Sequence, residues 1–228
     1  RYLILGGGPT AGYCAGEFVE QGIEQGDLAI LSADSYLPYD RPPLSKGFLT
    51  GDKDEGGVLI NPESFYKEHG IDVHLNSRAT RVDVAQKQVE TEGGDTFGYE
   101  KLLLATGSEL RTLDVDGAHE ADIQYLRTLD DAKRIRDEGS KAEAPVVIGG
   151  GFIGMEVAAG LAQHGRKVRL LFPEEHVMAR LFTRRMAVFF TGYYTQRGVE
   201  IMPGNAVHRF GTKNGRTARP AEARTAPS

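Results

Sequence analysis

The sequence predicts an α/β fold with two Rossmann-like dinucleotide-binding units. In each half of the chain, a short apolar run leads into a glycine cluster and then into a segment rich in small residues: YLILGGGPTAGYCAGEF at 2–18 and VVIGGGFIGMEVAAG at 146–160. A further apolar run follows each of these, at 28–31 and at 168–172. A strand, a tight turn, a helix and a second strand in this order form a βαβ unit of a parallel sheet.

The first unit is expected to begin with a buried strand at 2–5 and a helix that runs to about Gln21, where Gly22 would cap it. The prolines in LPYDRPPLSKGFL at 37–49 exclude a regular helix or a central strand, so a shaped loop leading into a short helix is expected there. Further strands are expected at 28–31, 71–74, 79–82 and 88–90, a hairpin turn at 92–95, and a buried strand that ends in a turn at 101–108.

The second unit is expected to contain a helix at 128–137, with Thr128 as its N-cap. A strand at 145–148, a helix at 152–163, a strand at 168–172 and a helix at 183–196 should follow, the last one capped by Gly198. From Gly211 the sequence loses all periodicity and has the composition of a disordered segment. The boundary between the units is expected near 110–116.

Charge and composition exclude several classes of protein. The formal net charge is −5 and no long basic run occurs, which argues against nucleic-acid binding. No apolar stretch approaches the roughly 18 residues of a membrane span, and no signal peptide is visible. The single cysteine, Cys14, excludes an internal disulfide and suits a reducing compartment, so a cytoplasmic location is expected. The six histidines show no metal-ligand spacing, so no metal site is expected.

Both glycine clusters fit the pattern that binds a dinucleotide pyrophosphate. The G-x-G-x-x-[GA] positions are Gly6, Gly8 and Ala11 in the first cluster and Gly149, Gly151 and Gly154 in the second. The small residues allow a tight turn and a close backbone approach, and the helix N-terminus then offers free N–H groups to the phosphates. An acid for the ribose follows each cluster, at Asp34 and at Glu174. Two cradles predict two dinucleotides, most simply FAD and NAD(P)H; the alternative is a pair of tight turns without a ligand.

The order of GGGPTAG, PYDRPPLSK, LATGS, LRTLDDA and GGGFIGMEVA resembles the FAD-dependent pyridine nucleotide reductases, which have the glutathione-reductase-like fold. Within them the chain is similar to the branch of ferredoxin-type reductases and apoptosis-inducing-factor-like proteins. The segment LFPEEHVMARLFTRRMAVFFTGYYTQRGVEIMPG at 171–204 is especially similar to monodehydroascorbate reductases. The resemblance covers about residues 1–210. It implies an FAD-binding domain, N-terminal part only, at 1–112, a partial NAD(P)-binding domain at 113–210, and a disordered or aberrant tail at 211–228.

The resemblance also implies a role for each matching residue. The FAD-binding residues would be Gly6, Gly7, Gly8, Pro9, Thr10 and Ala11 at the pyrophosphate, Asp34 at the ribose, Arg41 and Lys46 at the flavin half, Ala79 at the adenine, Ala105, Thr106 and Gly107 on the adenosine side, and Arg127 and Thr128 along the flavin. The NAD(P)H-binding residues would be Gly149, Gly150, Gly151, Phe152, Ile153, Gly154, Met155 and Glu156, completed by Glu174 and Arg180.

Lys46 and Glu156 are the two implied catalytic residues. They are expected in different units, each next to a cofactor motif, and the resemblance implies that they meet beside flavin N5. A cation there would stabilise negative charge on the reduced flavin, and the carboxylate would neutralise and orient the lysine. The alternative is an ordinary surface lysine and a glutamate near a helix N-terminus.

Carboxylates at the expected ribose site favour NADH over NADPH, because they accept hydrogen bonds from the two hydroxyls and repel a 2′-phosphate. Glu174 and Glu175 stand there, whereas Phe172 occupies the strand end itself, and Arg180 would weaken the preference.

The resemblance implies an NAD(P)H-dependent FAD oxidoreductase of incomplete fold, since neither the late Gly-Asp motif of the family nor its C-terminal domain is found in the sequence. Without a cysteine pair, electrons would leave the flavin directly. Monodehydroascorbate radical is the first choice of acceptor and a small iron–sulfur protein the second, as in ferredoxin or rubredoxin reductases. The alternatives are a catalytically inactive nucleotide-binding fragment and an interaction protein of the apoptosis-inducing-factor type whose assembly NADH controls.

Overall fold

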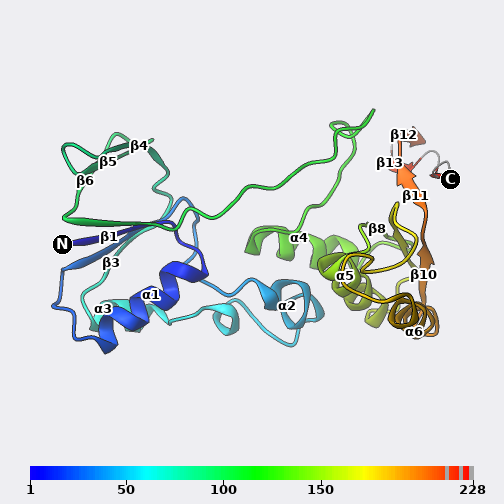
Figure 1. The fold of residues 1–228 in the computed structure, drawn as a ribbon, viewed down its shortest axis with the longest axis horizontal. Coiled ribbons are helices and arrows are strands. Elements are labelled where there is room, and N and C mark those ends of the chain that lie inside the picture. Colours follow the sequence, from blue (N-terminus) through cyan, green and yellow to red (C-terminus); the bar gives the residue numbers. More distant parts are fainter. Residues whose placement is uncertain (214–215, 221–222, 226–228) are drawn as a thin grey trace. The chain divides into compact units, whose positions relative to one another are not determined.

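The computed structural model describes residues 1–213, 216–220 and 223–225, and divides them into two compact units. The first unit contains residues 1–41 and 54–109. The second contains residues 42–53 together with the chain from Leu110 onward. The elements of both are labelled in Figure 1.

The first unit is built on a parallel sheet, as the sequence predicts. Its strands are β1 (Tyr2–Leu5), β2 (Leu28–Leu31), β3 (Asp72–His74) and β7 (Lys101–Leu104), in the order β3-β2-β1-β7. Helix α1 (Pro9–Glu20) joins β1 to β2, and α3 (Glu63–Glu68) precedes β3. A separate antiparallel sheet contains β4 (Ala79–Asp83), β5 (Gln88–Thr91) and β6 (Thr96–Gly98).

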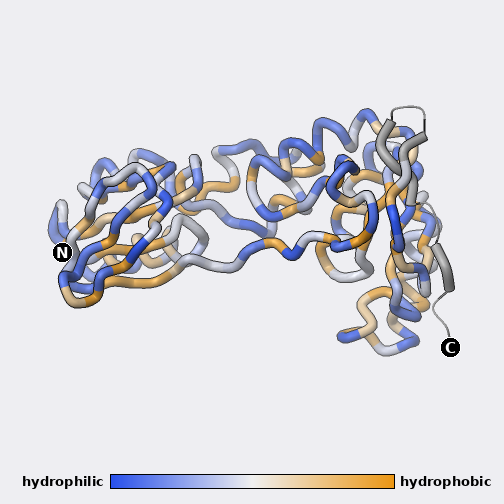
Figure 2. Tube along the Cα trace, turned by 90° about the horizontal axis from the view of Figure 1, so that it is seen from above, coloured by the Kyte–Doolittle hydropathy of each residue, from blue (hydrophilic) through white to orange (hydrophobic). Residues whose placement is uncertain are grey.

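Alternation along β1 and β2 places apolar side chains on both faces of the parallel sheet. Ile4 and Ile30 pack on one face with Ala11 and Ala15 of α1. On the other face, a second cluster contains Leu3, Leu5, Ala29, Leu31 and Val89, the last of these from β5. Figure 2 colours the chain by hydropathy, with its hydrophobic segments in orange. Burial on both faces explains why the strands appear in the sequence as continuous apolar runs.

Strand β7 differs from the expectation of a buried strand at 101–108. It ends at Leu104, and the side chains of Leu103 and Leu104 are 39% and 64% exposed. The reason lies in the topology: β7 is an edge strand that pairs with β1 on one side only. An apolar run indicates that burial of the strand would be favourable. The strand is buried only where another helix, strand or loop packs against it.

The second unit has its own parallel sheet, with β8 (Val146–Ile148), β9 (Val168–Leu171) and β10 (Val199–Met202) in the order β10-β9-β8. Helix α5 (Phe152–Gln163) joins β8 to β9, and α6 (Arg184–Thr195) joins β9 to β10. Helix α4 (Leu129–Gly139) precedes the sheet. The core cluster includes Ala158 and Leu161 of α5, Leu170 of β9 and Ala187 of α6.

Residues 42–53 belong to the second unit, although they interrupt the sequence of the first. They form the 3-10 helix η1 (Pro42–Ser45) and the short helix α2 (Gly47–Thr50). Leu49 is 1% exposed within the core cluster of the second unit, and the carbonyl of Leu49 lies 3.4 Å from His164 Nε2 at the end of α5. Phe48 is fully buried, with the Arg136 guanidinium 4.7 Å from the centre of its ring. This assignment differs from the domain at 1–112 that the resemblance implies, which includes the segment.

The tail, for which we expected disorder, contains short strands in its described part. β12 (Phe210–Lys213) begins one residue before the tail, and β13 (Arg216–Pro220) and β14 (Ala223–Thr225) lie within it; β11 (Asn205–Val207) precedes the tail. The short 3-10 helix η2 (Gly56–Val58) belongs to the first unit. β11 pairs with β14 and β12 with β13, both antiparallel. The rest of the expected tail lies outside the described residues. Across the part that is described, no helix has the length and apolar character to span a membrane.

Thr128 caps α4 through a reciprocal pair of hydrogen bonds, as the sequence predicts for an N-cap. The Asp131 N–H donates to Thr128 Oγ1 at 3.2 Å, and the Thr128 N–H donates to Asp131 Oδ2 at 2.8 Å. Thr183 caps α6 by a single longer bond, 3.4 Å from the Met186 N–H.

We expect Thr128→Ala to lower the free energy of unfolding by about 1 kcal/mol, because the substitution removes the acceptor of a capping box. Urea unfolding followed by circular dichroism measures the change. Thr183→Ala is the matched control and should cost less, because its single bond is longer. Equal losses in the two variants would contradict the role of the reciprocal pair.

Candidate functional site

The turn after β1 has the geometry of a phosphate cradle. Gly6 has a φ of +125°, and a Cβ there would lie 2.1 Å from the carbonyl oxygen of Ala105. A Cβ at Gly7 would lie 2.0 Å from Ser32 Oγ. Side chains are therefore excluded from this turn, and the backbone is open to a close approach by a ligand.

Helix α1 begins directly after this turn. Gly8 is its N-cap, with no side-chain hydrogen bond, and Pro9 stands in the first turn. Thr10 is exposed, whereas Ala11 is fully buried in the core cluster below the turn. The free N–H groups and the positive end of the helix dipole are thus available to an anion, which fits an FAD pyrophosphate.

Asp34 follows β2 and is held by its own loop. Its Oδ1 accepts a hydrogen bond from the Tyr36 N–H at 3.3 Å, and its Oδ2 accepts one from the buried Tyr39 hydroxyl at 3.1 Å. The Asp34 N–H itself donates to Ser32 Oγ at 3.1 Å. The carboxylate is therefore ordered beyond the carboxyl end of a parallel strand, where dinucleotide ribose groups bind in this class of fold.

Arg41 lies at the mouth of the same cradle. One of its terminal nitrogens is 3.8 Å from the position that a Cβ would take at Gly8. The loop that carries it is tied to α1, because the Tyr13 hydroxyl donates to the Asp40 carboxylate at 3.0 and 3.2 Å. This hydrogen bond raises the pKa of Tyr13 above its usual value. Sequence reasoning missed Tyr13, since only the folded loop brings Asp40 to it.

The other residues expected at the FAD site differ in where they lie. Ala105 closes the turn at Gly6, and its N–H donates to the Leu5 carbonyl at 2.8 Å. Thr106 and Gly107 follow it in exposed chain. Ala79 begins β4 and packs against the core cluster that contains Leu5. Arg127 and Thr128 lie in the second unit, where the Thr128 side chain is engaged in capping α4.

The turn after β8 repeats the geometry of the first cradle. Gly149 has a φ of +115°, and a Cβ at Gly154 would lie 1.9 Å from the Gly149 carbonyl oxygen. A Cβ at Gly150 would lie 2.7 Å from the Phe172 ring. Gly151 is the N-cap of α5, again without a side-chain hydrogen bond. This second turn therefore fits a dinucleotide pyrophosphate for the same physical reasons.

The first turn of α5 presents residues of two kinds. Phe152 and Ile153 are 59% and 56% exposed, so their apolar side chains are available to a ligand at the cradle. Met155 is 5% exposed, and its side chain packs α5 against the core cluster of the second unit. Glu156 keeps 25% of its side chain exposed and points to the segment at 42–53.

Lys46 and Glu156 meet, as the sequence analysis expects. Lys46 Nζ lies 2.9 Å from Glu156 Oε2 and also donates to the Pro42 carbonyl at 3.3 Å. The same Oε2 accepts a hydrogen bond from Ser45 Oγ at 2.5 Å. The expectation that the pair spans two units is wrong, because η1 and α2 pack with α5 in the second unit. Sequence reasoning also missed Ser45, which lies 111 residues from Glu156.

Glu174 and Arg180 are both exposed beyond the carboxyl end of β9. Phe172, which stands at the strand end, is fully buried beneath Gly150. Beside Glu174 lies an open pocket of about 560 Å³ between the start of α6 and the ends of β9 and β10. Its lining includes Phe172, Glu175, His176, Arg184, Val188, Thr191, Ile201 and Pro203.

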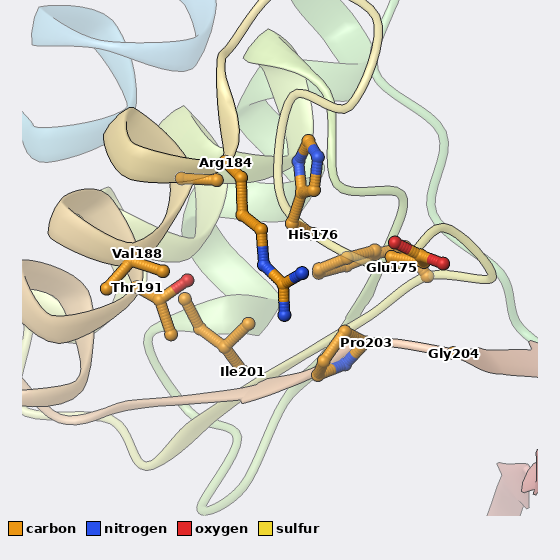
Figure 3. A pocket seen from close by; sticks show the side chains of 10 residues that line it. Glu175, His176, Arg184, Val188, Thr191, Ile201, Pro203 and Gly204 are labelled. Atoms are coloured by element: carbon orange, nitrogen blue, oxygen red, sulfur yellow. The ribbon is translucent and has the colours of Figure 1, made fainter.

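Figure 3 shows the Arg184 side chain extending from α6 into this pocket, with His176 and Glu175 beside it. Local sequence gives no signal that Arg184 and His176 share a pocket, because they lie on different elements. The pocket thus adds charged side chains next to the expected ribose site. Across the described ranges, no three His, Cys, Asp or Glu side chains gather in a way that could hold a metal ion.

Tyr193 and Tyr194 stand side by side in the sequence of α6 but differ in their surroundings. Tyr194 packs partly buried against the core cluster of the second unit, and this burial, together with the negative charge of Glu156, raises its pKa. Tyr193 is 43% exposed, with the Arg197 guanidinium 3.5 Å from its ring centre. Packing thus accounts for Tyr194.

Comparison with known proteins agrees with this geometry. The family model described as pyridine nucleotide-disulphide oxidoreductase matches residues 1–224. The chain is 40% identical to the peroxisomal monodehydroascorbate reductase 1 of Arabidopsis thaliana over 226 residues, which is 92% of this chain and 52% of the relative. It is 39% identical to the cytosolic monodehydroascorbate reductase 4 of Oryza sativa subsp. japonica, with the same coverage.

Solved structures give the same result for the fold. A ferredoxin reductase from Rhodopseudomonas palustris superimposes with a TM-score of 0.86 at 31% identity, over 95% of this chain and 53% of that one. Putidaredoxin reductase, in its covalent complex with putidaredoxin, gives a TM-score of 0.88 at 29% identity, with the same coverage. The predicted α/β fold is therefore confirmed, while the chain spans about half the length of the curated relatives that it matches.

The family match covers almost the whole chain, and it supports the expected cofactor pair of FAD and NAD(H). Together with identities near 40% over nine-tenths of the sequence, it leads to one conclusion: the chain belongs to the pyridine nucleotide-disulphide oxidoreductase family.

Proposed function

We propose that this chain is the nucleotide-binding part of an oxidoreductase that passes a hydride from NADH to FAD and then single electrons to an acceptor. The two glycine cradles support two dinucleotide sites, and the family match supports a pyridine nucleotide as one of the two ligands. Names among the similar solved structures point the same way, for example NADH:rubredoxin oxidoreductase from Clostridium acetobutylicum at 28% identity.

The observation that carries this proposal is the 2.9 Å contact between Lys46 Nζ and Glu156 Oε2. Glu156 lies near the start of α5, directly beyond the cradle glycines, so the pair stands beside the expected NADH site. A lysine ammonium has three N–H donors, and the structure gives Lys46 two acceptors, Glu156 and the Pro42 carbonyl. One donor remains for a ligand, and the side chain is 53% exposed to receive it.

When bound, FAD would supply the chemistry that a protein chain lacks: it accepts a hydride and releases electrons one at a time. The contribution of Lys46 would be electrostatic, since a fixed cation stabilises negative charge that develops beside it. Glu156 would neutralise the ammonium in the resting protein and hold its direction. Phe152 and Ile153 would shield the cradle from water with their exposed apolar side chains.

NADH is the favoured nicotinamide cofactor. Glu174 and Glu175 bring two carboxylates to the expected ribose site, where they would repel a 2′-phosphate. Arg180 and Arg184 lie in the same region and would weaken that preference.

Monodehydroascorbate radical is the acceptor we favour, because several relatives near 40% identity carry the name monodehydroascorbate reductase. A small redox protein is the second candidate, supported by the ferredoxin reductase and by the putidaredoxin reductase–putidaredoxin complex. The single cysteine and the cytosolic rice relative favour a cytoplasmic location.

The test is the visible absorption spectrum of the purified chain with FAD, recorded before and after addition of NADH or NADPH without oxygen. We expect a flavin spectrum that bleaches faster with NADH than with NADPH. A bound flavin that neither nucleotide bleaches would contradict the proposed hydride transfer, and a failure to bind FAD would leave only a nucleotide-binding module.

For the ion pair, we expect Lys46→Ala and Glu156→Ala each to slow flavin reduction by NADH roughly 10- to 100-fold, because each removes part of a preorganised charge beside the reacting atoms. NADH affinity should change little. Stopped-flow absorbance measures both quantities. Lys53→Ala is the matched control, an exposed lysine of the same 42–53 segment. Unchanged reduction rates in both pair variants would remove the role assigned to them.

For the second cradle, we expect Gly154→Ala to weaken NADH binding at least about tenfold, because the new Cβ would collide with the Gly149 carbonyl and force the turn open. Calorimetric titration with NADH measures the affinity. Gly192→Ala on α6 is the control: among the described residues, no atom outside the neighbouring backbone of its own helix lies within 4 Å of the added Cβ, so affinity should stay constant. Wild-type affinity in Gly154→Ala would argue against NADH at this turn.

A further inference from the structure

Ser45 is a buried polar residue next to the ion pair of Lys46 and Glu156. Its exposed fraction is 5%, and its hydroxyl donates to Glu156 Oε2 at 2.5 Å. The ammonium of Lys46 reaches the same oxygen atom at 2.9 Å. Ser45, the last residue of η1, and Lys46, which follows it, therefore bind the same carboxylate oxygen of Glu156 on α5.

The two donors differ in how firmly they are held. The Lys46 side chain is 53% exposed and carries a flexible four-carbon stem. An ion pair of that kind is screened by water and contributes little on its own. Ser45 has a single short side chain, and its neighbours Leu44 and Phe48 are 2% and 0% exposed. A hydrogen bond from a fixed, buried donor to a charged acceptor is the stronger restraint.

The hydroxyl proton of Ser45 has one favourable destination. A serine hydroxyl donates a single hydrogen bond, and the alternative acceptor, the Pro42 carbonyl, is 3.4 Å away. The Glu156 oxygen is nearly 1 Å closer. The Pro42 carbonyl is then left to Lys46 Nζ, which lies 3.3 Å from it. The three groups thus form one consistent network: the serine holds the glutamate, and the glutamate and a backbone carbonyl hold the lysine.

We propose that Ser45 is the positioning residue that fixes Glu156 as the counter-ion of Lys46. Without the hydroxyl, the carboxylate of Glu156 turns toward solvent, and the ammonium loses the acceptor that directs it. The role of this network in hydride transfer rests on the proposed function, whereas the network itself is a property of the second unit and is testable without any cofactor.

The test measures the reactivity of Lys46 in the cofactor-free chain. Trace acetylation with acetic anhydride, followed by mass spectrometry, reports how strongly each lysine is held as a hydrogen-bonded ammonium. The internal reference is Lys67 of α3, which belongs to the first unit and pairs with Glu63 at 2.6 Å. The variants are Ser45→Ala, Ser45→Cys, Ser45→Thr and Glu156→Gln.

We expect the labelling of Lys46 relative to Lys67 to rise on the order of two- to fivefold in Ser45→Ala and in Glu156→Gln. Ser45→Cys keeps the size of the side chain but offers only a weak donor, so it should behave like Ser45→Ala and separate the hydrogen bond from packing. Ser45→Thr keeps the hydroxyl and should stay at the wild-type value. Circular dichroism checks that each variant is folded.

Two results would overturn the proposal, and they differ in what they say about the ion pair. If Glu156→Gln raises the labelling of Lys46 while Ser45→Ala and Ser45→Cys leave it unchanged, the pair exists but Ser45 does not hold it. If Glu156→Gln also has no effect, the pair does not form in solution, and the catalytic role proposed for Lys46 and Glu156 falls with it.

Discussion

The close approach of backbone to backbone at two glycine turns is the constraint on which the candidate sites depend. A side chain at Gly6 would meet the Ala105 carbonyl at 2.1 Å, and one at Gly154 would meet the Gly149 carbonyl at 1.9 Å. Only glycine allows each strand to turn this sharply into its helix. The turn then aims the free N–H groups of α1 or α5 at the space where a phosphate would bind. Asp34 and Glu174, beyond the next strand of each unit, complete the same arrangement.

The second organising feature is the packing of residues 42–53 with α4 and α5. Phe48 and Leu49 are almost fully buried, and Leu49 joins the core cluster of the second unit. Burial of large apolar side chains contributes far more than a half-exposed ion pair, on the order of 1.5–3 kcal/mol each against about 0.2–1. Apolar packing therefore positions the segment, and this position brings Ser45 and Lys46 within hydrogen-bonding distance of Glu156. The position of the pair therefore depends on buried hydrophobic residues of the same segment.

The edge strand β7 of the first sheet exposes apolar side chains. Leu103 and Leu104 belong to an apolar strand, yet they stay exposed at the edge of the first sheet. The relatives are about twice as long as this chain, which corresponds to about half of each of them. The proposal about electron transfer accordingly rests on residues of the chain itself, while the choice of acceptor rests on the names of relatives.

The sequence by itself determined the local features: the strand, turn and helix around each cradle, the acids that follow them, and the cap at Thr128. These depend on neighbours within a few residues, where glycine, proline, capping side chains and hydrophobic periodicity act directly. Only the tertiary structure decided that residues 42–53 belong to the second unit, that Ser45 binds a carboxylate 111 residues away, and that Arg184 enters a pocket. Such contacts follow from which buried surfaces fit together, and local sequence patterns do not encode that choice.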